Sequence, residues 1–138
     1  MNHQLRRFVL PPVIAILAWV GPLAAHEEPE EEIEELTERI ARAPESADLF
    51  LQRAIEYQVM GKLTEAAKDL ERSLRLSPGL VLAQRELART YFAQGKTNEA
   101  MTSVTSALQA TTAGADRGSL LIVRAELYHA RREPAKAL

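Results

Sequence analysis

The stretch Ala47–Leu80 reads ADLFLQRAIEYQVMGKLTEAAKDLERSLRLSPGL, and its pattern returns 34 residues further along the chain. That shift places identical residues on one another: Ala54 on Ala88, Tyr57 on Tyr91, Gly61 on Gly95, Glu65 on Glu99 and Ala66 on Ala100. Self-similarity at this period is typical of solenoids built from pairs of helices. The sequence therefore predicts an all-α fold, an α-solenoid of helix-turn-helix units.

Each unit has the signals of two helices joined at a glycine. In the first unit a helix is expected over residues 48–60, and Gly61 is expected to supply its left-handed C-cap. Thr64 is expected to cap the second helix, which Pro78 and Gly79 end. The second unit repeats these signals with a helix over residues 81–94, a break at Gly95 and a cap at Asn98. Small residues recur where the helices would cross, and the tyrosines are expected in the core: Ala54 with Ala66, Ala88 with Ala100, and Tyr57, Tyr91 and Tyr128.

These residues resemble the tetratricopeptide repeat, over about residues 47–138. The family pattern of a small residue, Tyr, Gly, Ala and a closing Pro is met by Ala54, Tyr57, Gly61, Ala66 and Pro78. The second unit meets it with Ala88, Tyr91, Gly95, Ala100 and Ala107. Some positions depart from the pattern: Phe50 and Gln84 replace Trp, Arg53 replaces Leu, and Thr112 replaces the closing Pro.

The rest of the chain is divided around these two units, 47–80 and 81–114. Residues 26–46 are predicted to be an acidic lead-in and a packing helix that ends at Pro44. An incomplete third unit, 118–138, is shifted by 37 residues, and the three added residues are placed in a polar loop over 111–118. Pro134 is expected to begin a last helix. Because that helix stops at Leu138, we expect either a fragment of a longer repeat protein or an end that another subunit covers.

The first 25 residues have the composition of a secretory signal peptide. Arg6 and Arg7 precede an apolar run over 8–20, and Ala24 and Ala25 end the segment. We expect cleavage near Ala25/His26 and a periplasmic or secreted protein. An uncleaved segment would instead anchor the chain to the membrane.

Composition and charge exclude several classes of site. The chain has no cysteine, so disulfides and thiolate sites are excluded. From Leu36 onward there are 15 Lys and Arg against 12 Asp and Glu, too small an excess for nucleic-acid binding. No phosphate-binding loop, zinc motif or nucleophilic serine motif is present. No cofactor, metal site or catalytic activity is expected.

The family resemblance implies a concave groove lined by the first helix of each unit. It marks these residues: Leu51, Ile55, Gln58, Val59, Leu82, Arg85, Arg89, Phe92, Ile122, Glu126 and His129. Arg85 and Arg89 lie one helical turn apart, so together they would grip a carboxylate, or they are surface residues paired with Glu86 or Glu126. Family members that bind acidic chaperone tails use Lys and Asn where Leu51 and Ile55 stand, so that activity is not implied.

The favoured function is a protein-protein interaction scaffold that binds a peptide or an unidentified partner protein in this groove, outside the cytoplasm. An N-terminal docking arm of a longer exported enzyme is the alternative. A third hypothesis is self-association through the unfinished C-terminal end.

Overall fold

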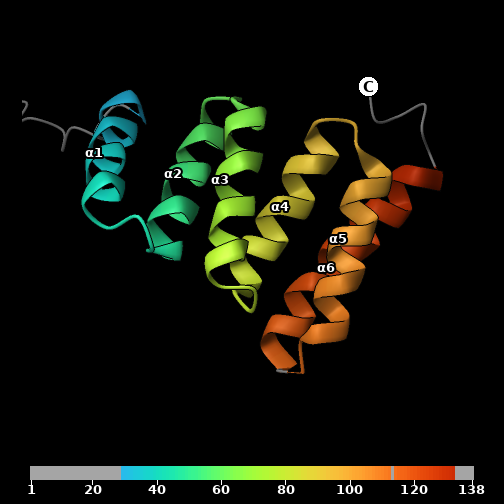
Figure 1. Ribbon diagram of the computed structural model, residues 1–138. Coiled ribbons are helices and arrows are strands. Elements are labelled where there is room, and N and C mark those ends of the chain that lie inside the picture. Colours follow the sequence, from blue (N-terminus) through green and yellow to red (C-terminus); the bar gives the residue numbers. More distant parts are fainter. Residues whose placement is uncertain (1–28, 113, 133–138) are drawn as a thin grey trace, which may run out of the picture.

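The computed structural model describes residues 29–112 and 114–132, which form six α-helices packed in chain order (Figure 1). They are α1 (Pro29–Arg42), α2 (Ala47–Val59), α3 (Leu63–Leu76), α4 (Val81–Ala93), α5 (Thr97–Ala110) and α6 (Gly114–Arg132). The predicted all-α solenoid of helix pairs is confirmed. None of these helices is both long enough and apolar enough to span a membrane.

The 34-residue period extends one helix further towards the N-terminus than the repeated sequence does. Helices α1, α3 and α5 begin at Pro29, Leu63 and Thr97, and α2 and α4 begin at Ala47 and Val81. By this register α1 is the second helix of a preceding unit, and it packs only on α2 among the described helices. Leu36 and Ile40 make that contact. The expected packing helix is therefore present, and it ends two residues before Pro44.

The turns inside the first two units confirm the expected glycine conformations. Gly61 has a φ of 71° and Gly95 a φ of 77°, values that side chains with a Cβ rarely adopt. The amides after these glycines close the turns, Lys62 N donating to Tyr57 O and Lys96 N to Tyr91 O, both at 2.8 Å.

The predicted caps of the second helices are wrong. Helices α3 and α5 begin at Leu63 and Thr97, one residue before Thr64 and Asn98, and neither has a side-chain cap. The backbone explains the difference, because the carbonyls of Lys62 and Lys96 already accept the first helical hydrogen bonds, from Ala66 N and Ala100 N.

The core is a series of three apolar clusters between successive helices, and small side chains occupy the crossings. Ala54, Ala66, Ala88 and Ala100 are all 0% exposed, as expected of residues that let two helices approach closely. Tyr91 packs against the second and third clusters of the series, which places it in the core. Tyr128 does not follow it: its side chain is 53% exposed on α6, so the prediction of a core tyrosine there is wrong.

The third unit differs from the expected loop and helix. Helix α6 begins at Gly114 and is 19 residues long, compared with 13 in α2 and in α4. Most of the segment predicted as a polar loop is thus an additional turn at the start of this helix. Arg117, in that turn, donates from Nη1 to the carbonyls of Leu108 and Thr111 at 2.6 and 3.2 Å, which joins α6 to the end of α5.

Among the described residues, polar side chains make more bonds between the helices of the first two units than between α6 and its neighbours. Arg53 bonds Asp69 on α3 and Thr37 on α1. Further bonds join α2 to α3 through Ser73 Oγ and Ala47 O, and α3 to α4 through Tyr91 with Glu71 and Gln94 with the carbonyl of Leu63. The predicted signal peptide, its cleavage site and the last helix from Pro134 lie outside the described residues.

Candidate functional site

The first helices of the units form a layer of their own. Helix α2 contacts α4, and α4 contacts α6, whereas α3 and α5 make no such contact with each other. The helices that carry the expected groove residues therefore lie side by side, and a peptide lying across this layer would meet residues from three units.

On α2 the expected groove is partly core. Leu51 is only 5% exposed and belongs to the cluster that also contains Ala54 and Leu70, so in this structure its side chain contributes to the core. Ile55 is half-buried and packs against the same cluster. Val59, at the end of the helix, is 68% exposed.

Exposed apolar side chains continue on α4 and α6. Leu82 is 39% exposed near the start of α4, and Ile122 is 59% exposed on α6. Phe92 is half-buried against the cluster formed by α4, α5 and α6. Three of the expected groove residues, one on each helix of the layer, thus present apolar surface to solvent.

The two arginines on α4 are paired within their own helix. Nε and Nη2 of Arg85 both lie 2.9 Å from Oε1 of Glu86, and Nη1 of Arg89 lies 3.8 Å from the same oxygen. The glutamate side chain is 13% exposed, compared with 30% for Arg85 and 45% for Arg89. Of the two hypotheses for these arginines, the structure shows the pairing with Glu86. The surface still carries one net positive charge here.

Gln58, one of the expected groove residues, also joins two helices of the layer. Its Nε2 donates to Thr90 Oγ1 at 2.7 Å, and the Thr90 hydroxyl donates to the carbonyl of Glu86 at 2.8 Å. Thr90 is 1% exposed, so this bond crosses from α2 to α4 beneath the surface. Gln58 therefore positions the turn of α4 that carries three charged residues, Arg85, Glu86 and Arg89, called the charged trio below. Its register could have indicated this, since Gln58 and Thr90 stand two positions apart on adjacent first helices.

Glu126 and His129 are exposed on α6. Among the described residues neither has a hydrogen-bond or ion-pair partner, and no group of three or more His, Asp or Glu side chains could hold a metal ion. Glu126 thus adds a carboxylate to the layer, and His129 adds an imidazole.

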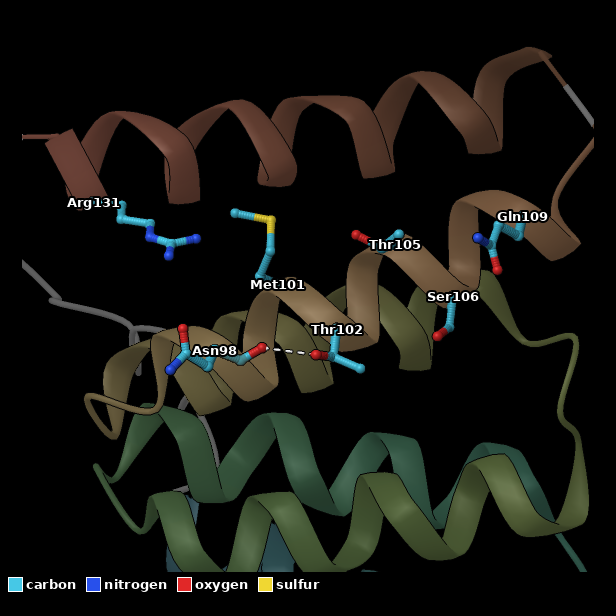
Figure 2. A pocket seen from close by; sticks show the side chains of 7 residues that line it. All are labelled: Asn98, Met101, Thr102, Thr105, Ser106, Gln109 and Arg131. Carbon is cyan, nitrogen blue, oxygen red and sulfur yellow. Dashed lines mark hydrogen bonds between the residues drawn. The ribbon is translucent and has the colours of Figure 1, made fainter.

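A separate pocket of about 370 Å³ lies between α5 and α6 (Figure 2). Arg131 reaches from α6 towards α5, whose side chains supply the rest of the lining: Asn98, Met101, Thr102, Thr105, Ser106 and Gln109. None of these residues was expected to bind a ligand, because the family resemblance directs attention to the first helices only.

Residues 60–117 match a family model described as tetratricopeptide repeat. Over these residues the chain is similar to the tetratricopeptide repeat family. The matched range begins directly after α2 and covers all of α3 to α5 and the start of α6. Proteins with this repeat are in general protein-protein interaction modules, and the repeat itself is typically not catalytic.

Two solved structures share the arrangement of this repeat array. The crystal structure of the Sgt2 TPR domain from Aspergillus fumigatus matches with a TM-score of 0.64 and 22% identity, over 78% of this chain and 74% of that one. The crystal structure of MamA matches with a TM-score of 0.55 and 16% identity, over 78% and 71%. At these identities the likeness concerns the fold. A search of curated proteins finds no match.

Proposed function

We propose that the layer formed by α2, α4 and α6 binds an extended peptide segment of a partner protein. The observation that carries this proposal is the placement of Val59, Leu82 and Ile122, one exposed apolar side chain on each helix of the layer. Single exposed apolar residues are ordinary, but three on neighbouring helices of one layer favour a contact surface. A peptide crossing the layer would gain apolar contacts in all three units.

The charged trio at the centre sets what such a peptide should carry. A carboxylate on the peptide competes with Glu86 for Arg85 and Arg89, so it gains less than it would from two free arginines. Arg89, the more exposed of the two and 3.8 Å from Glu86, is the more available partner. The preferred ligand is therefore an apolar peptide with an isolated acidic group or a free C-terminus.

The test is a display library of random peptides selected on the full chain, followed by affinity measurements with two matched variants. Ile122→Ala should weaken binding by roughly 1–2 kcal/mol because it removes an apolar contact. Leu121→Ala is the control, since Leu121 is its neighbour on α6, is as exposed as Leu82 and lies outside the expected groove positions. Equal losses in both variants, or selected peptides that tolerate both, would contradict the proposal.

We also propose that this binding takes place outside the cytoplasm. The support is the sequence alone: Arg6 and Arg7, the apolar run over 8–20 and the small residues Ala24 and Ala25. N-terminal sequencing of the protein from its natural host should find His26 as the first residue. Protein that starts at Met1 in the cytoplasmic fraction would refute this localisation.

A further inference from the structure

The two ends of the helix row differ in what they leave uncovered. Helices α1 and α6 lie at opposite ends (Figure 1). Leu121 and Tyr128 on α6 are 39% and 53% exposed, and Ala125 between them is exposed as well. Their counterparts one unit earlier include Ala88 and Tyr91, which α5 covers. Among the described residues, no second helix covers this side of α6 in the way that α5 covers α4.

Helix α1 also has one side that no described helix covers. It is a second helix by register, and it packs on α2 as α3 packs on α4. In α3 the opposite side packs on α2, the first helix of its own unit. In α1 that side meets no described helix. Among the described helices, α6 is thus a first helix without a second helix on it, and α1 is a second helix without a first helix on that side.

The charges of these two ends are opposite. Helix α1 carries six glutamates and two arginines, whereas α6 carries four arginines, one aspartate and one glutamate. The repeat register identifies one possible ion pair between these ends, Arg124 with Glu35. Arg124 precedes Ala125 as Arg53 precedes Ala54, and Glu35 stands 34 residues before Asp69, the partner of Arg53.

Both members of this prospective pair are available in one copy of the chain. Arg124 is half-buried and has no ion-pair partner among the described residues. The side chain of Glu35 is 58% exposed, and its contact with Arg39 is a loose one of 3.6 Å. An exposed ion pair of this kind is weak, so exchanging it for another partner costs little.

We propose that a second copy of this chain seats its α1 on α6, with Glu35 of one copy paired to Arg124 of the other. Leu121, Ala125 and Tyr128 then lie beneath the incoming helix, and Arg131 and Arg132 lie close to its acidic first turns. The contact is heterologous, so each added copy exposes the same two ends again and association grows with concentration. Glu32 of α1 stands where Ala66 and Ala100 make close crossings, so the two copies pack less tightly than two units within a chain.

Sedimentation velocity of the full chain over a range of concentrations and salt tests this proposal. We expect oligomers that grow with concentration at low salt and dissociate at high salt, because the interface depends on charge. Arg124→Glu and Glu35→Arg should each weaken association about tenfold, since each places like charges opposite one another. The chain with both substitutions should regain association, because the pair is then restored with its charges reversed.

Circular dichroism shows whether each variant is folded, and all variants share the same apolar N-terminus, so their differences report the two charges. Several results would overturn the proposal: a monomer at every concentration in low salt, a closed dimer that does not grow, or single variants whose defects the double variant does not repair. Peptide binding to the α2, α4 and α6 layer is measured separately at high salt, where the copies are dissociated. A failure of self-association can therefore be distinguished from a failure of peptide binding.

Discussion

Arg53 on α2 holds Asp69 on α3 through two parallel hydrogen bonds, Nε to Oδ2 at 2.7 Å and Nη2 to Oδ1 at 2.9 Å. Its Nη1 donates to Thr37 Oγ1 on α1 at 2.9 Å, so one guanidinium joins three helices. The hydrogen bonds that Arg53 donates to Asp69 raise the pKa of Arg53 above its usual value, although burial opposes the charged form. The second unit has Leu87 and Ser103 at these two positions.

Arg53→Leu should destabilise the protein by roughly 2–4 kcal/mol, because it leaves the carboxylate of Asp69, only 10% exposed, without its partner. Arg53→Leu combined with Asp69→Ser reproduces the pair that the second unit already has, and its stability should return to within about 1 kcal/mol of the parent. Urea unfolding of the single and double variants measures both. If the double variant is less stable than Arg53→Leu alone, the unpaired carboxylate of Asp69 is not what destabilises the single variant.

Two glycines of this chain should respond in opposite directions to the same substitution. Gly61→Ala forces a Cβ into a φ of 71° and should cost about 1 kcal/mol, whereas Gly118→Ala lies inside α6 and should stabilise by about 0.5–1 kcal/mol. Neither added Cβ meets another atom within 4 Å, so the comparison isolates the backbone. Thermal melting followed by circular dichroism distinguishes them. Shifts of the same sign would contradict the conformations found here.

Stability at high pH should depend on Tyr91. Burial of the phenol and its hydrogen bond to Glu71 raise the pKa of Tyr91 from 10 to about 12. The neutral phenol is favoured in the folded chain, so its contribution is complete below pH 10 and is lost as the pH rises from 10 to 12.

Tyr91→Phe should therefore be less stable than the parent near neutral pH, and its stability should fall less steeply above pH 10. The other two tyrosines and the lysines are common to both proteins and cancel in the comparison. Absorbance of tyrosinate gives an independent measurement, in which a titration with a pKa of about 12 should disappear from the variant. Parallel stability curves would mean that the raised pKa has no effect on folding.

Glu86→Gln should change which peptides the α2, α4 and α6 layer prefers. It removes the carboxylate that neutralises Arg85 and Arg89, so a selected peptide with a free carboxylate should bind about tenfold more tightly. The amidated form of the same peptide is the control and should bind the variant and the parent equally. Fluorescence anisotropy with labelled peptides measures both affinities. An equal gain for both forms would mean that Glu86 acts through packing and not through charge.

The helices of the first two units could be predicted from the sequence because their signals are local and repeated. The glycines with a positive φ and the small residues at crossings are signals within one helix pair. The 34-residue period repeats these signals in the next pair. The caps at Thr64 and Asn98 could not be predicted, since a side chain able to cap competes with a backbone turn that begins the helix one residue earlier.

The candidate site was harder to predict, because it depends on contacts between units. Leu51 has the same chemical character as Val59, and only the packing against Ala54 and Leu70 shows that it is core. The hidden contact of Gln58 with Thr90 crosses 32 residues of sequence. Tyr128 shares its motif with Tyr91, yet the helix that would cover it is not among the described ones. Repeat patterns identify equivalent positions, but the neighbours of those positions change at the ends of an array.

The side-chain bonds between helices are unevenly distributed, and this gives the array a direction of opening. Arg53 joins α1, α2 and α3, and Gln58, Tyr91 and Gln94 hold α4 to the helices before it. Among the described residues, α6 is held by apolar contacts and by Arg117 at its first turn. Its far end can separate from α5 without breaking any such bond. Amide exchange should therefore be fastest there, and the array should unzip from α6 while its acidic end stays closed.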